Sequence, residues 1–107
     1  MNAFKKIKKI HFVGIGGAGM IGIARVLLQK GYKISGSDIT ISADLNKLRN
    51  EGAKVYQGHS KSNLKDVDLL VLSSAIHKSN SEVLKAKELG ITTIPRAEML
   101  GSIMRGY

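Results

Sequence analysis

A cluster of glycines near the N-terminus, Gly14-Ile15-Gly16-Gly17-Ala18-Gly19, fits the pattern G-x-G-x-x-G. Between a strand and a helix, Gly14 permits a tight turn, Gly16 lets backbone amides approach an oxygen closely, and Gly19 lets the helix pack on the strand. Unpaired amides at the helix N-terminus, with its partial positive charge, favour a pyrophosphate. The loop therefore predicts a phosphate site, and a tight turn that binds nothing is the alternative.

Other polar groups lie where they could accompany this loop. Asp38 follows the second expected strand, where its carboxylate can accept hydrogen bonds from a ribose or base, although a solvated strand end or a helix cap uses the same residue type. Ser73-Ser74-Ala75-Ile76 follows the fourth expected strand and could contact a phosphate or sugar, or simply form a turn. His59 could reach the crevice mouth, whereas His11, inside a strand, is expected to be a packed residue.

The chain holds no recognisable catalytic set. It has no cysteine, which excludes a disulfide framework, thiolate zinc sites and a cysteine nucleophile. Its three histidines lack metal-ligand spacing, and no serine lies in a G-x-S-x-G setting. We therefore expect no catalytic residue and no metal site, and a role in binding.

The elements that must position these groups alternate between strands and helices. Apolar runs predict strands at 10–13, 32–37, 54–56, 68–73 and 91–94. Helices are expected at 20–28, after a cap at Ser42, after a cap at Asn80 or Ser81, and from about Arg96 to Met104, with Met99 and Met104 facing the core; residues 57–65 are expected to form a loop with one helical turn. Right-handed crossovers then predict one α/β domain over residues 1–107, Rossmann-like and doubly wound, with a parallel five-stranded sheet of order 3-2-1-4-5 and helices on both faces.

The composition is strongly basic, with 17 Lys and Arg against 8 Asp and Glu and a formal charge of +9. This favours an anionic partner: a nucleic acid, a membrane surface or a phosphorylated small molecule. Aromatic residues make up only 5%, and no nucleic-acid motif is present, so nucleic acid is the weakest of these. No apolar run reaches the roughly 18–20 residues of a membrane span, and no secretory signal is visible. We expect no nucleic-acid or membrane partner and a cytoplasmic location.

The number of strands bears on which anion the loop holds. A dinucleotide-binding fold usually has two halves and six strands, whereas about five are expected here. A nucleoside diphosphate joined to a sugar needs only the first half and the adjacent crevice. This favours a nucleotide sugar and leaves an NAD(H)-binding module of a dehydrogenase or redox sensor as the alternative.

The stretch Ile10–Met20, followed by Gly22-Ile23-Ala24, resembles the N-terminus of the Mur ligase family. Later motifs follow in the order and spacing of that family: Ser35-Gly36-Ser37-Asp38, Gly58-His59, Ser73-Ser74-Ala75-Ile76 and Pro95-Arg96-Ala97-Glu98-Met99-Leu100. The resemblance covers nearly the whole chain, and only Ile21 departs slightly from the small residue common at its position.

The resemblance implies the N-terminal UDP-sugar-binding domain of a three-domain ligase, with the ATP-binding and amino-acid domains outside residues 1–107. The parent protein would use ATP and Mg²⁺ to join L-alanine to UDP-N-acetylmuramate in peptidoglycan synthesis. A related ligase, which recycles a whole peptide onto the same sugar nucleotide, is the nearest alternative. This piece alone is expected to be inactive, to hold no cofactor, and to contact its own central and C-terminal domains.

By resemblance, the loop holds the diphosphate, Ser37 and Asp38 approach the uridine, and the segment from Ser73 to Ile76 lines the other side. With His59 added, the substrate-binding residues expected are Gly14, Ile15, Gly16, Gly17, Ala18, Gly19, Met20, Ser37, Asp38, His59, Ser73, Ser74, Ala75 and Ile76.

Overall fold

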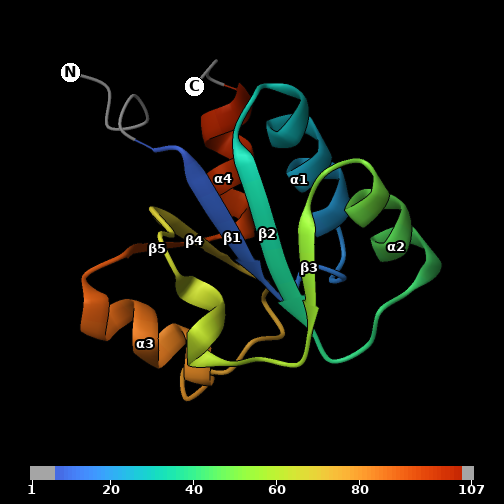
Figure 1. Ribbon diagram of the computed structural model, residues 1–107. Helices are drawn as coiled ribbons and strands as arrows, with labels where there is room; N and C mark the ends of the chain where they lie inside the picture. The colour runs from blue at the N-terminus through green and yellow to red at the C-terminus, as the bar shows by residue number, and fades with distance from the viewer. Residues whose placement is uncertain (1–6, 105–107) are drawn as a thin grey trace.

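The computed structural model describes residues 7–104, and five strands of this segment form one sheet in the order β3-β2-β1-β4-β5 (Figure 1). The strands are β1 (Lys9–Val13), β2 (Lys33–Asp38), β3 (Lys54–Gln57), β4 (Leu69–Leu72) and β5 (Thr92–Pro95). Every neighbouring pair is parallel. The predicted fold class and strand order are therefore confirmed.

Helices cover both faces of the sheet (Figure 1). They are α1 (Met20–Gln29), α2 (Ala43–Asn50), the 3-10 helix η2 (Lys61–Leu64), α3 (Ser81–Leu89) and α4 (Arg96–Met104). The larger core cluster joins side chains of α1, α2 and α4, among them Leu27, Leu45 and Met99, to one face of the sheet. The smaller cluster joins η2 and α3, through Leu64 and Ala86, to the other face.

Local signals in the sequence explain where these helices begin and end. The hydroxyl of Ser42 accepts a hydrogen bond from the amide of Leu45 at 3.2 Å and caps α2. Of the two caps considered for α3, Asn80 is the one used: its Oδ1 accepts from the amide of Glu82 at 2.9 Å. Gly90 ends α3 in the left-handed conformation, with φ of 72°.

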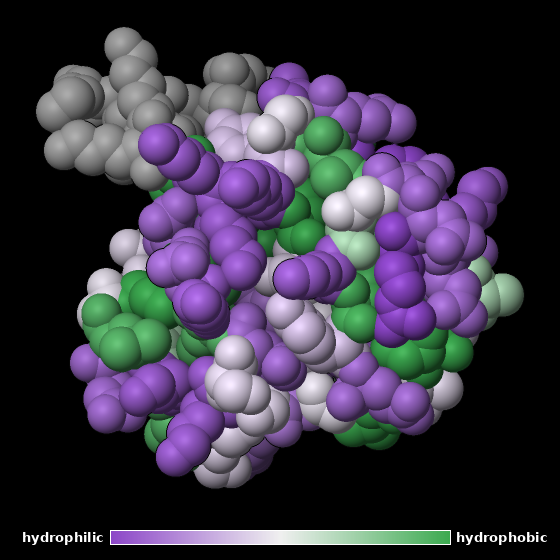
Figure 2. Space-filling view, in the orientation of Figure 1, coloured by the Kyte–Doolittle hydropathy of each residue, from purple (hydrophilic) through white to green (hydrophobic). Residues whose placement is uncertain are grey.

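Buried polar residues distinguish the face of the sheet that carries α3. Register pairs His11 with Ser35 and Val13 with Ser37, so these four alternate residues of β1 and β2 lie on one face. His11 is fully buried there, which confirms it as a packed residue. Figure 2, in the orientation of Figure 1, shows hydrophilic residues over much of the visible surface.

Some sequence predictions fall on residues or side chains outside this description. Met99 is buried as predicted, but the side chain of Met104 is not among those described. Within residues 7–104, no helix is both long and apolar enough to cross a membrane.

Candidate functional site

The glycine loop connects β1 to α1 through two tight turns. Gly14 and Gly19 adopt left-handed φ angles of 77° and 75°, which glycine tolerates best. The amide of Gly17 donates to the carbonyl oxygen of Gly14 at 2.9 Å. A Cβ on Gly17 would lie 2.7 Å from the Oγ of Ser73, so the loop packs directly against the end of β4. The tight turn predicted at Gly14 is confirmed.

Hydrogen bonds within the chain already occupy most amides of this loop. The amides of Gly14 and Ile15 both donate to the carbonyl oxygen of Ser37, at 2.9 and 3.0 Å. The amide of Gly16 donates to Oδ2 of Asp38 at 2.8 Å. The expectation of a loop lined by bare amides is therefore corrected, because β2 supplies acceptors that the glycine pattern does not reveal.

Free donors remain at the start of α1. Within the part of the chain that the structure describes, the amides of Ala18 and Gly19 are the ones in the loop without a protein acceptor. Gly19 is the N-cap residue of α1, where the partial positive charge of the helix is greatest. Fewer amides of the loop are thus available to an anion than the sequence predicted.

Two of the expected ligand residues are core residues instead. The side chains of Ile15 and Met20 are fully buried. The amide of Met20 donates to the carbonyl oxygen of Gly17 at 3.0 Å, and that of Ile15 is held by Ser37. Both residues therefore fix the shape of the loop, and neither offers a side chain or an amide to a ligand.

A cavity of about 440 Å³ opens at the carboxyl edge of the sheet, where the strand order reverses between β1 and β4. Parallel α/β sheets bind ligands at this edge, and the volume suits a small organic ligand. Most of the expected residues line it: Gly14, Gly16, Gly17, Asp38, His59, Ser73, Ala75 and Ile76. Ile39, His77 and Asn80 also line it and were not expected, whereas Ile15, Ala18, Gly19, Met20, Ser37 and Ser74 lie outside the lining.

Two lining residues also hold the local backbone. The carboxylate of Asp38 accepts from the amide of Thr40 at 3.3 Å through Oδ1, besides its bond to the loop. The Oγ of Ser73 accepts from the amide of Ala75 at 3.3 Å. Ser73 is therefore a turn-forming serine, one of the two roles considered for it, while it also forms part of the cavity wall.

A buried carboxylate lies directly behind this cavity. The side chain of Glu82 is fully buried, and its Oε1 accepts from His11 Nε2 at 2.7 Å and from Ser37 Oγ at 2.6 Å. Its Oε2 accepts from the amide of Ser60 at 3.0 Å and from Asn63 Nδ2 at 2.8 Å. Burial raises the pKa of Glu82, but the hydrogen bonds from His11, Ser37 and Asn63 and the attraction to His11 outweigh it and lower the pKa to about 2.

Sequence reasoning missed Glu82 because a glutamate in the first turn of a helix is ordinarily a solvated residue that complements the helix dipole. A signal was nevertheless present in the strands. Strands buried in parallel sheets are usually apolar throughout, yet β1 and β2 carry His11, Ser35 and Ser37. Buried polar groups in such strands require a partner. Glu82 provides it for His11 and Ser37, and His11 Nδ1 provides it for the Oγ of Ser35 at 2.7 Å.

Arg96, the first residue of α4, is a second residue to which the sequence analysis assigned no role. A Cβ on Gly19 would lie 3.1 Å from a terminal guanidinium nitrogen of Arg96, so this cation stands beside the free amides of the loop. Among residues 7–104, no carboxylate forms an ion pair with it. Its position directly after β5, at the carboxyl edge of the sheet, is the signal that could have identified it.

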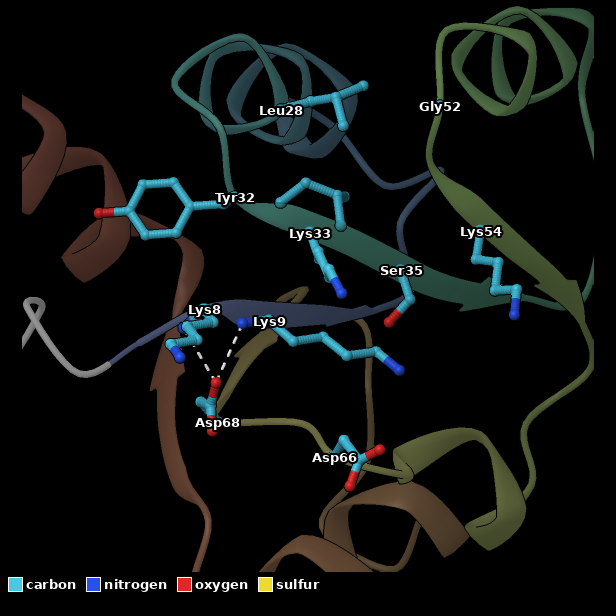
Figure 3. A pocket seen from close by; sticks show the side chains of 11 residues that line it. Lys8, Lys9, Leu28, Tyr32, Lys33, Ser35, Gly52, Lys54, Asp66 and Asp68 are labelled. Carbon is cyan, nitrogen blue, oxygen red and sulfur yellow. Dashed lines mark hydrogen bonds between the residues drawn. The ribbon is translucent and has the colours of Figure 1, made fainter.

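A larger cavity, of about 720 Å³, lies at the opposite edge of the sheet (Figure 3). The carboxylate of Asp68 accepts from the amides of Lys8 and Lys9 at 2.9 and 3.0 Å, and the ammonium of Lys9 donates to the carbonyl oxygen of Lys65 at 2.8 Å. These bonds hold the start of β1 against the segment before β4. None of the expected site residues lines this cavity, so the carboxyl-edge cavity is the candidate site.

Together, the glycine loop, the strand-end carboxylate of Asp38 and the cavity at the reversal of strand order define a Rossmann-like α/β domain with a candidate ligand site at the carboxyl edge of its sheet. Within residues 7–104, no three His, Asp or Glu side chains gather closely enough to hold a metal ion.

Comparison with known proteins narrows this class. Residues 9–107 match the family model described as "Mur ligase family, catalytic domain". The chain belongs to the Mur ligase family, which confirms the resemblance seen in its motifs. A curated relative, the UDP-N-acetylmuramate–L-alanine ligase of Sulfurihydrogenibium sp. (strain YO3AOP1), is 57% identical over 100 residues, which are 94% of this chain and 22% of the relative. The chain thus spans about a fifth of the length of the curated relatives that it matches.

Solved structures agree with this assignment. The UDP-N-acetylmuramate-alanine ligase of Thermotoga maritima superposes with a TM-score of 0.87 and 31% identity, over 91% of this chain and 23% of that one. A ligase from Neisseria meningitides that joins UDP-N-acetylmuramate to L-alanyl-γ-D-glutamyl-meso-diaminopimelate superposes with a TM-score of 0.75 and 28% identity, over 83% of this chain and 28% of that one. The chain is similar to both, and more so to the first.

Proposed function

We propose that this chain is the nucleotide-sugar-binding domain of an ATP-dependent ligase that joins L-alanine to UDP-N-acetylmuramate in peptidoglycan synthesis. The family match over residues 9–107 carries the proposal, together with the 57% identity to a relative of that name. The greater similarity to the alanine ligase structure than to the peptide ligase structure supports alanine as the amino acid that the whole protein uses.

The arrangement of the site suggests how the ligand lies. The free amides of Ala18 and Gly19 and the guanidinium of Arg96 form a cationic corner beside α1, which suits the diphosphate. Asp38 and His59 line the cavity on the side of β2 and suit the hydroxyl and N–H groups of a uridine. The segment from Ser73 to Ile76 forms the opposite wall.

The remaining roles are assigned to the whole protein. We propose that residues 1–107 form one substrate-binding unit, that ATP and Mg²⁺ bind to other domains of a cytoplasmic protein, and that this unit contacts those domains. The alternative of a nucleic-acid partner gains no support from the site, whose cavity of about 440 Å³ suits a single small ligand.

Isothermal titration calorimetry tests the proposal. The purified chain is titrated with UDP-N-acetylmuramate, with N-acetylmuramate that lacks the nucleotide, and with NADH. We expect binding of the nucleotide sugar alone. N-acetylmuramate lacks the diphosphate and the nucleoside that the loop, Arg96 and the cavity suit, and NADH usually needs a six-stranded fold with two nucleotide-binding halves, whereas this sheet has five strands. Binding of NADH without binding of UDP-N-acetylmuramate would instead support the dehydrogenase or redox-sensor alternative.

A further inference from the structure

We propose that Ser37 and Glu82 are positioning residues that fix the proton of His59 on Nδ1, so that its Nε2 presents a hydrogen-bond acceptor to the nucleoside part of the ligand. The identity of that ligand rests on the proposed function. The state of the His59 ring does not, because it follows from contacts within the chain.

The hydroxyl proton of Ser37 determines which tautomer the imidazole ring of His59 adopts. The Oγ of Ser37 lies 2.6 Å from Oε1 of Glu82 and 2.8 Å from Nδ1 of His59. An ionised carboxylate can only accept, so the one hydroxyl proton of Ser37 must be donated to Glu82. The Oγ of Ser37 is then an acceptor for His59, and Nδ1 must carry the proton. A neutral His59 therefore has its lone pair on Nε2.

The contacts of Glu82 are those of an ionised carboxylate. Each of its two carboxylate oxygens faces two donors, which come from β1, β2, the loop before η2, and η2 itself. Its side chain is fully buried, so water cannot replace any of these donors. The carboxylate is thus fixed in place by the fold, and it fixes Ser37 in turn.

The other side of the His59 ring faces the ligand cavity. The side chain is 17% exposed and lines the cavity, and within residues 7–104 its Nε2 has no protein partner. The titratable groups around the ring are Glu82 of α3, with Oε2 4.0 Å from Nδ1, and Asp38 and His77, which line the same cavity. None of them forms a hydrogen bond with Nε2.

This arrangement determines which part of a nucleotide sugar His59 can recognise. An ionised phosphate has acceptors only, so it repels the lone pair of a neutral Nε2. A ribose hydroxyl or the N–H of a base donates to it. His59 therefore selects for the nucleoside, while the amides of Ala18 and Gly19 remain for the diphosphate.

Long-range ¹H–¹⁵N NMR of the ligand-free chain at about pH 8.5, some two units above the ordinary histidine pKa, reads the tautomer directly. We expect the Nδ1 of His59 to show the shift of a protonated nitrogen and Nε2 that of an unprotonated one. Ser37→Ala removes the acceptor, and we expect the two shifts to converge or exchange. Ser35→Ala is the matched control, because it deletes an equally buried hydroxyl from the same face of β2. That hydroxyl bonds Nδ1 of His11 at 2.7 Å and makes no bond to His59, whose own bond to Ser37 is left in place.

A wild-type His59 protonated on Nε2 would overturn the proposal, and this measurement needs no variant to fold. An unchanged tautomer in Ser37→Ala would also overturn it. Titration with UDP-N-acetylmuramate then separates the positioning of His59 from the proposed function. We expect Ser37→Ala to weaken binding of this ligand about tenfold and Ser35→Ala to weaken it much less. If the wild-type chain shows the expected tautomer but does not bind this ligand, the proposed function fails while the positioning role stands.

Discussion

Ile15 lies so close to Gly36 that a Cβ on Gly36 would stand 2.5 Å from Cδ1 of Ile15. The one large side chain of the glycine loop therefore occupies the space above β2 that another residue would fill with its own side chain. Because Ile15 is fully buried there, it ties the loop to the sheet. The packing of the loop therefore requires a glycine at position 36.

We predict that Gly36→Ala lowers the free energy of unfolding by roughly 1–3 kcal/mol, since the added methyl group overpacks a filled site. Urea denaturation measures this change. Gly22→Ala is the control, because Gly22 is exposed within α1 and no atom lies within 4 Å of the position that its new methyl group would take. That change should raise stability by about 0.5–1 kcal/mol, and equal stability of the two variants would contradict the close packing of Ile15 on Gly36.

Replacing Arg96 with alanine should weaken the binding of UDP-N-acetylmuramate by roughly 1.5–3 kcal/mol, the usual contribution of a hydrogen bond to a charged group. Titration calorimetry at two salt concentrations measures it, and the affinity of the variant should depend less on salt. Arg25→Ala is the control, because it removes the same charge from a residue of α1 that is paired with Glu51 at 2.8 Å. Equal losses in both variants would show a general charge effect and no contact with the diphosphate.

Asp38→Ala should weaken the binding of UDP-N-acetylmuramate by roughly 1–3 kcal/mol. The change removes an acceptor proposed for the nucleoside and leaves the amide of Gly16 without its partner. Asp44→Ala makes the same change of charge on an exposed residue of α2 and should leave the affinity unchanged. Tighter binding by Asp38→Ala would mean that the carboxylate repels the ligand, which would contradict its assignment to the nucleoside.

Stability should fall on acidification because of Glu82. Its pKa is lowered from the ordinary 4.5 to about 2, so the folded state favours the ionised form. The resulting stabilisation is fully present above pH 4.5 and is lost as the pH falls towards 2. Urea midpoints measured across this range should therefore decrease. Glu82→Gln should flatten the decrease and cost roughly 3 kcal/mol at neutral pH, whereas Glu88→Gln, at an exposed position of the same helix, should do neither.

The fold could be predicted from the sequence because its determinants are local. Ser42 and Asn80 cap helices, Gly90 ends one, and the apolar runs mark strands whose right-handed connections leave few possible orders. The edge of the sheet that carries the site follows from that order alone. Asp38, His59 and Ser73 meet there as expected, because each ends a strand, directly follows one or lies in the loop after one.

The sequence could not predict which amides of the glycine loop already have acceptors within the chain, because this depends on contacts between distant residues. The pattern G-x-G-x-x-G fixes the turn at Gly14 but not the acceptors, which Ser37 and Asp38 supply from β2. The role of Glu82 depends in the same way on a partner 71 positions earlier, His11. Such pairs form only when the chain is folded, and spacing within one segment does not reveal them.

The bond between Asp38 and Gly16 has a consequence for selectivity. This carboxylate is a negative group tethered to the chain, and its bond to the amide of Gly16 holds the middle of the turn in shape. Chloride, sulfate or free phosphate would have to compete with a negative group that cannot diffuse away. This shielding is confined to the Gly16 amide, whereas within residues 7–104 the amides of Ala18 and Gly19 have no such internal competitor.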